Sequence, residues 1–191
     1  MNVGNQEWQE WIESIVAKAA KYNLLVDIHD AYRPNGFSRT YPNLLTQEGI
    51  HGNEQVPNAD HNTMLPFTRF TIGAGDYTPG YTRKDLQTTF AHRLALPVIY
   101  YSPAQFLFWN EKLTDEHKRP ELDFWKNIPT VWQDTKFLLG EIGEYAVVAR
   151  RSGTTWYVGG ITNTNARCLQ LDCSFLSSDK KYIATIYTDD V

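Results

Sequence analysis

Apolar residues near the N-terminus recur at the three- and four-residue spacing of an amphipathic helix, which predicts a helix over Gln6–Lys21. A nearly continuous apolar run, Leu24–Ile28, follows it, as is typical of a parallel strand covered on both faces. A helix that leads into a buried parallel strand is half of a repeating unit. We therefore expect a further strand before the helix, upstream of Met1.

Further strands and a helix are predicted along the chain. Apolar runs predict strands at Leu44–Gly49 and Phe67–Ile72, and a longer apolar segment predicts a helix over Asp85–Tyr100, capped by Asp85 or its neighbours. The polar stretch 109–129 reads as a connector that holds a short helix around Glu121–Lys126.

Beyond Pro129 the apolar period changes to two, which is the period of strands. Turn residues such as Ser152 and Gly153 separate the runs, so the pattern predicts an antiparallel meander. Its predicted strands are Glu144–Arg150, Thr155–Ile161, Cys168–Cys173 and Tyr182–Tyr187. Cys168 and Cys173 would then lie on opposite faces of one strand, as two buried thiols without a disulfide.

Length and composition narrow the classes of protein. The chain has 191 residues, 42% apolar and 14% aromatic, as in a globular enzyme. A complete (β/α)8 barrel needs roughly 250 residues, so the chain is expected to be a fragment of one. A net charge of -4 with scattered Lys and Arg gives no footprint for nucleic acid. Neither a signal peptide nor an apolar run long enough to span a membrane is present in the sequence.

Polar chemistry is concentrated between Asp27 and Glu54, directly after the first predicted strand. His29 and Asp30 follow this strand, and Glu48 and Glu54 flank the end of the next one. In a parallel barrel the loops after the strands open onto one face and carry the functional side chains. The segment is therefore interpreted as a catalytic rim.

Four blocks in this order resemble glycoside hydrolase family 97, the calcium-dependent α-glycosidases. They are HDAYRPNGFSRTYPN at 29–43, QEGIHGNE at 47–54, LPFTRF at 65–70 and GDYTPG at 75–80. The resemblance implies an α/β fold in which residues 1–129 form the C-terminal half of a (β/α)8 TIM barrel. Residues 130–191 would begin an antiparallel β-sandwich domain, which is incomplete here.

The resemblance also assigns roles to residues. Glu54 matches the general acid, and Asp30, Glu48 and Glu54 match calcium ligands. The residues matched to substrate binding or support are His29, Arg33, His51 and Asp76, with Arg39 and Tyr41 as further candidates.

One position departs from part of the family, because inverting members have a Glu base where this chain has Asp30. Retaining members use an Asp nucleophile on the strand before the first helix, which would lie upstream of Met1. We therefore expect a retaining enzyme for α-linked galactosides or glucosides, inactive in this piece alone. The alternatives are an inverting α-glucosidase with Asp30 as base, a carbohydrate-binding fragment, and a hydrolase with a transition metal, although no HxH or HExxH pair is present.

For the parent protein the resemblance implies an oligosaccharide or α-glycoside substrate and a periplasmic or extracellular location. An open barrel leaves strand edges uncovered. The fragment is therefore expected to associate through those edges.

Overall fold

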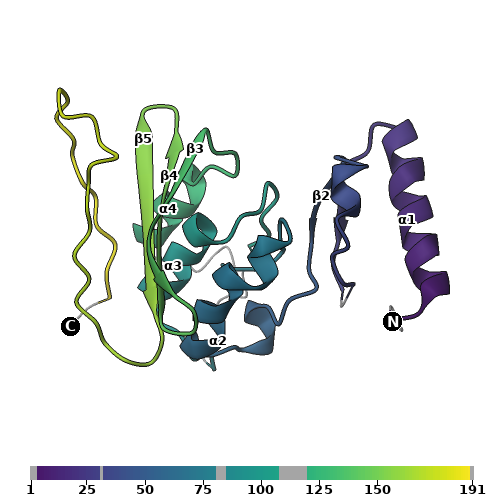
Figure 1. The fold of residues 1–191 in the computed structure, drawn as a ribbon, viewed down its shortest axis with the longest axis horizontal. Helices are drawn as coiled ribbons and strands as arrows, with labels where there is room; N and C mark the ends of the chain where they lie inside the picture. Colours follow the sequence, from purple (N-terminus) through teal and green to yellow (C-terminus); the bar gives the residue numbers. More distant parts are fainter. Residues whose placement is uncertain (1–3, 31, 81–84, 108–119, 190–191) are drawn as a thin grey trace, which may run out of the picture.

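The computed structural model describes residues 4–30, 32–80, 85–107 and 120–189 (Figure 1). The polypeptide runs from helix α1 at one end of the molecule to an extended C-terminal segment at the other. Its helices and strands are α1 (Gln6–Lys21), β1 (Val26–Ile28), β2 (Leu44–Gln47), α2 (Ala59–Met64), α3 (Phe90–Ile99), α4 (Pro120–Asn127), β3 (Asp134–Glu141), β4 (Tyr145–Ser152) and β5 (Thr155–Thr162). Within this part of the chain, no helix is both long and apolar enough to cross a membrane.

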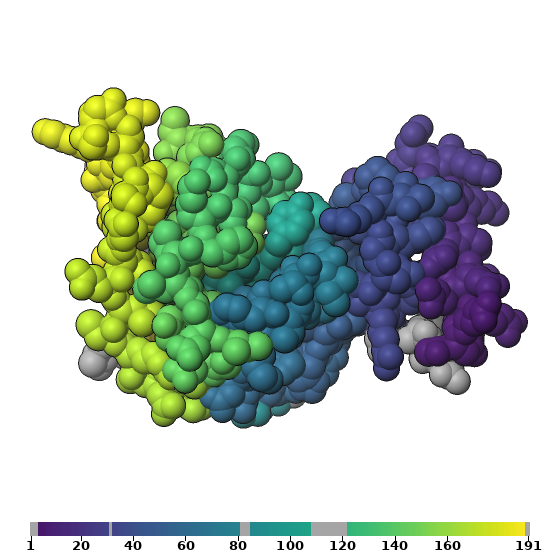
Figure 2. Space-filling view, viewed as in Figure 1, coloured from purple at the N-terminus to yellow at the C-terminus, as the bar shows by residue number. Residues whose placement is uncertain are grey.

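The N-terminal unit consists of α1 and the parallel pair β1 and β2, and it lies at one end of the molecule in Figure 2. Helix α1 begins at Gln6 because the Asn5 side chain accepts a hydrogen bond from the Trp8 amide at 2.9 Å. The Asn43 amide group ties the helix to the strands by donating to the carbonyls of Val16 and Leu24. The predicted helix and the two predicted strands are thus confirmed, with shorter strands.

The predicted strand Phe67–Ile72 is wrong. Two 3-10 turns, η3 (Leu65–Phe67) and η4 (Arg69–Thr71), take its place. Pro66 suits the first turn of a helix and removes a donor from any strand ladder. The Thr68 hydroxyl donates to the Met64 carbonyl and supports the turns.

Helix α3 begins later than predicted, at Phe90, because Thr89 rather than Asp85 is its cap. The Thr89 hydroxyl accepts a hydrogen bond from the His92 amide at 3.3 Å. The predicted short helix around Glu121–Lys126 is confirmed as α4.

The C-terminal unit is a three-stranded antiparallel sheet, β3-β4-β5, with α3 packed against it. The backbone of α3 approaches β5 closely: a methyl group at Gly159 would stand 2.7 Å from the Ala95 carbonyl oxygen. The buried Arg150 guanidinium donates to the carbonyls of Val98 and Ile99 at the end of α3. The apolar core here comprises Leu65, Tyr77, Leu96, Ile99, Tyr100, Ala146, Val148 and Ile161.

Two predictions in the C-terminal half are wrong and one strand was missed. The segments Cys168–Cys173 and Tyr182–Tyr187 form no strand, and both cysteines are exposed rather than buried. Ile183 is 99% exposed, so the alternating apolar side chains there have no second layer to cover them. Strand β3 was not predicted, because three consecutive apolar residues, Phe137, Leu138 and Leu139, interrupt the two-residue period at a bulge.

The observed architecture is therefore of mixed α and β type, with a parallel pair of strands and a separate antiparallel sheet. The complete barrel, the sandwich and the division at residue 129 stay predictions. The apolar core joins residues on both sides of that division, from Leu65 to Ile161.

Candidate functional site

An open pocket of about 760 Å³ lies where β1 and β2 end, on the side of their carboxyl termini. It gathers side chains from two segments of the chain, the loop that follows β1 and the stretch that follows β2. Its lining consists of His29, Asp30, Arg33, Glu48, Gly49, Ile50, His51, Glu54 and Gln55. Of the residues matched to catalysis, substrate or calcium, all but three line this pocket. Asp76 contacts His29 from the side, and Arg39 and Tyr41 lie outside the lining.

His29 connects the acids of the pocket. Its Nδ1 lies 2.8 Å from an oxygen of Asp76, which is only 1% exposed. Its Nε2 faces the other way, 3.9 Å from a Glu48 oxygen and 3.8 Å from a Glu54 oxygen. Burial lowers the pKa of the imidazole, but the Asp76 hydrogen bond and the Glu48 charge outweigh it, so the pKa is raised overall.

Glu48 and Glu54 differ in exposure. The Glu48 side chain is 9% exposed and that of Glu54 is 37% exposed, so Glu54 reaches further into the pocket. Burial raises the pKa of the Glu48 carboxyl, the charge of His29 opposes this, and the charge of Glu54 adds to it. The two carboxylates therefore repel each other across the imidazole.

The loop that carries Glu48 is held by Arg69, a residue that the sequence pattern did not single out. Its guanidinium donates to the carbonyls of Gln47 at 2.8 Å and Glu48 at 3.0 Å. The same group donates to the carbonyls of Gly73 and Ala74 in the loop that leads to Asp76. Arg69 thereby connects the two loops whose acids meet at His29.

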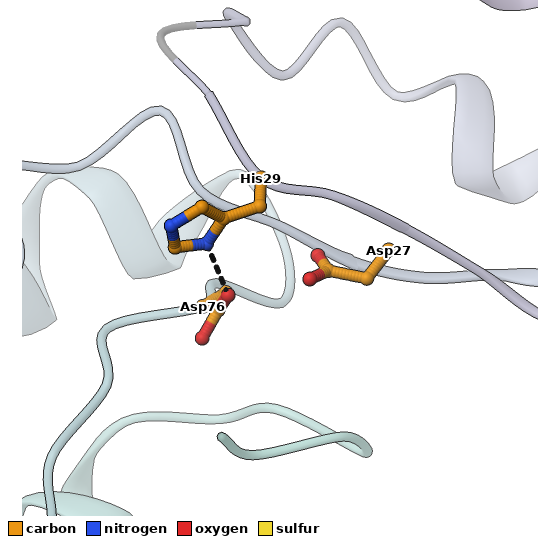
Figure 3. A group of neighbouring side chains, drawn as sticks. All are labelled: Asp27, His29 and Asp76. Carbon is orange, nitrogen blue, oxygen red and sulfur yellow. Dashed lines mark hydrogen bonds and ion pairs between the residues drawn. The ribbon is translucent and has the colours of Figure 1, made fainter. Parts of the chain in front are cut away.

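Asp27 is a second residue that the sequence pattern did not single out. It lies on β1 with His29 two positions later, so both side chains point to one face of the strand, toward Asp76 (Figure 3). Acceptor or donor atoms of Asp27, His29 and Asp76 all lie within 4.8 Å of one another. Burial, then the charge of Asp76 and a hydrogen bond to it, raise the pKa of Asp27 to about 7.

Two of the other predicted residues lie at the rim of the pocket, and two lie outside it. Arg33 and His51 are exposed at the pocket, and the His51 ring lies edge-on to His61, with ring centres 5.3 Å apart. Arg39 and Tyr41 lie outside the lining, where the Tyr41 ring packs on Phe37.

The donor set suits a hard cation. One oxygen each of Glu48 and Glu54 lies within 4.8 Å of the other and of His29 Nε2. Calcium binds oxygens at about 2.3–2.6 Å, so two oxygens on one ion are at most about 5 Å apart. A cation between them would also relieve the repulsion of the two carboxylates. Asp30 lines the same pocket and offers further oxygens.

Sequence profiles of one family match both ends of the chain. The profile described as "Glycoside hydrolase 97" matches residues 1–50. The profile described as "Glycosyl-hydrolase 97 C-terminal, oligomerisation" matches residues 131–191.

Relatives agree with this assignment. A "Retaining alpha-galactosidase" from Bacteroides thetaiotaomicron is 39% identical over 100% of this chain and 32% of its own length. A family 97 enzyme from Pseudoalteromonas sp. strain K8, solved with panose, has a TM-score of 0.75 and 30% identity, covering 86% of this chain and 28% of its own. A structure titled beta-arabinopyranosidase has a TM-score of 0.68 and 30% identity, covering 83% and 28%.

This chain thus spans about a third of the length of the relatives it matches. The two profiles and the Pseudoalteromonas structure carry the name of one family, which the four sequence blocks also resemble. The chain belongs to glycoside hydrolase family 97.

Proposed function

We propose that the pocket is the acid/base side of the active site of an α-glycosidase that retains anomeric configuration. One observation carries the proposal: Glu48 and Glu54 converge on His29 at the carboxyl ends of two parallel strands. Glycoside hydrolysis needs a carboxylic acid that protonates the leaving oxygen and a second carboxylate. The pocket offers both kinds of group.

Glu54 is the proposed general acid, because it is the more exposed of the two glutamates and an acid must reach the leaving oxygen. It protonates the glycosidic oxygen in the first step. In the second step its carboxylate accepts a proton from the water that releases the sugar. The nucleophile of this retaining reaction would come from another part of the parent protein.

Asp30, Glu48 and Glu54 are the proposed calcium ligands, and further ligands would come from elsewhere in the parent protein. Bound calcium would neutralise the carboxylates and fix their positions. Three carboxylates leave a calcium shell incomplete. Calorimetry on the chain alone should therefore give weak binding, and tight stoichiometric binding would contradict a shared shell.

An α-galactoside is the preferred substrate in this proposal, supported by the name of the Bacteroides relative. Glucosides are the alternative, and the neighbour solved with panose supports an oligosaccharide in either case. His29, Arg33 and His51 would contact the sugar hydroxyls, and Asp76 would support them through its hydrogen bond with His29. A periplasmic or extracellular location, and association of the isolated chain through exposed strand edges, belong to the same proposal.

The test uses the parent enzyme and its Glu54→Gln variant. The variant should slow aryl α-galactosides with poor leaving groups far more than those with good ones, because only poor leaving groups need the proton. Equal losses on both would contradict the acid role. Asp123→Asn, which changes an exposed side chain on α4 outside the pocket lining, is the control.

Proton NMR early in hydrolysis reads the stereochemistry. An α-sugar as first product means retention. A β-sugar would mean inversion, and Asp30 would then be the catalytic base. Inverting sites hold their carboxyls roughly 6.5–9.5 Å apart to admit a water, against about 5–5.5 Å in retaining sites.

A further inference from the structure

Two acids beside the pocket, Asp76 and Asp27, take no part in the bond cleavage proposed above. Asp76 is 1% exposed, and one of its oxygens faces His29 Nδ1 at 2.8 Å. Asp27 lies to one side of it, on β1, as Figure 3 shows. Among the residues that the structure describes, Oδ1 of Asp27 and Oδ1 of Asp76 are both buried without a hydrogen-bond partner.

Two carboxyl groups can share a hydrogen bond only if one of them carries a proton. Carboxyl oxygens of Asp27 and Asp76 lie within 4.8 Å of each other, and a hydrogen bond to Asp76 is one cause of the raised pKa of Asp27. Asp76 is the acceptor for the His29 ring, so the proton belongs on Asp27, whose pKa is raised to about 7 chiefly by burial. Asp76 then lies between the His29 ring, at 2.8 Å from Nδ1, and the Asp27 carboxyl group.

The position of Asp76 decides which nitrogen of His29 carries hydrogen. A carboxylate at Nδ1 requires a proton there, whether the ring is neutral or charged. In the neutral ring Nε2 then has a free lone pair, and it points to the space beside Glu48 and Glu54. Turning the ring over would break the bond to a buried carboxylate.

We propose that Asp76, supported by Asp27, is a positioning residue that holds His29 with Nδ1 protonated and Nε2 directed into the pocket. Nε2 can then accept a hydrogen bond from a ligand hydroxyl. The inference rests on the proposed function only for the nature of that ligand, a sugar. The arrangement of the three side chains stands on their contacts alone.

The test is long-range proton–nitrogen NMR of the histidine rings in the ¹⁵N-labelled chain, at a pH where His29 is neutral. The His29→Gln variant assigns the His29 signals by removing them. Wild-type His29 should show a protonated Nδ1 and an unprotonated Nε2. A ring protonated at Nε2, or a mixture of the two forms, would overturn the proposal without need of any further variant.

Substitutions of Asp76 show whether it sets the protonated nitrogen of His29 or only fills space beside the ring. Asp76→Ala removes the acceptor and should shift His29 toward protonation at Nε2, whereas Asp76→Asn keeps an acceptor oxygen and should preserve the wild-type pattern. An unchanged pattern in Asp76→Ala would contradict the role of Asp76. Asp123→Asn, at an exposed site on α4, is the matched control and should change nothing.

The support from Asp27 is tested in the same way. Asp27→Asn supplies a permanent N–H donor to Asp76 and should leave the His29 pattern intact. Asp27→Ala removes the donor and should broaden the Nδ1 proton signal through exchange with water. Equal spectra for the two variants would remove Asp27 from the proposal. These spectra need no substrate, so their failure would leave the Glu54 experiment unaffected.

Discussion

The two units of the molecule are stabilised in different ways. In the C-terminal unit, α3 packs on the antiparallel sheet, and Leu96 and Ala149 are fully buried there. In the N-terminal unit the apolar side chains Trp11, Leu24 and Leu25 are between 52% and 70% exposed. The candidate site lies at the ends of β1 and β2, where loops from later in the chain reach this unit. Its geometry therefore depends on polar contacts, such as those of Arg69 and Asp76, more than on an apolar core.

The largest expected effect is in the C-terminal core. Leu96→Ala should lower the free energy of unfolding by about 2–5 kcal/mol, because it removes buried methyl groups and leaves a cavity. Urea unfolding followed by circular dichroism measures the change. Ile183→Ala, at a side chain that is 99% exposed, is the control and should stay within about 0.5 kcal/mol of wild type.

Two neighbouring glycines on β5 test how closely α3 packs on the sheet, with a smaller expected loss of stability. Gly159→Ala should cost about 1–3 kcal/mol, because the added methyl would meet the Ala95 carbonyl in the neighbouring helix. At Gly160 the nearest atom to an added methyl is on Val147 at 3.7 Å, an ordinary contact. If Gly160→Ala destabilised the protein as much as Gly159→Ala, the close approach of α3 would not be the cause.

The smallest expected effect is in the N-terminal unit, and it depends on pH. The pKa of Asp27 is raised from 3.8 to about 7 in the folded chain, so the fold favours the protonated acid. Its contribution to stability is present at low pH and is lost as pH rises through the folded pKa. Asp27→Asn cannot ionise, so it should become more stable than wild type as the pH rises from 3.8 to about 7. Unfolding curves at a series of pH values test this, and a constant difference would contradict the raised pKa.

Local patterns in the sequence were enough for α1, the parallel strands and the location of the pocket. His29 and Glu48 each follow a short apolar run, and the ends of parallel strands meet at one edge. Their convergence on one pocket follows from that rule. The pattern could also have found Asp27, because a residue two positions before His29 on a strand shares its face.

Other features depended on contacts that no local pattern records. The segment around Arg69 has the apolar content of a strand, yet the guanidinium turns inward to carbonyls of two distant loops. The alternating residues around Ile183 predict a strand, but an isolated alternating segment needs a covered face and a paired neighbour to form one. Strand β3 is paired in spite of its broken period, because β4 supplies the partner.

Arg69 also affects how this protein meets other chains. Uncovered strand edges are templates for pairing with strands of a second molecule. At the end of β2, the Gln47 carbonyl already accepts from the Arg69 guanidinium and from the Asp76 amide. An incoming strand would have to displace both donors, and the buried guanidinium would lose one of the carbonyls to which it donates. The contact that holds the site loops together therefore also covers the last carbonyl of β2, so strand pairing with a second molecule would have to begin elsewhere.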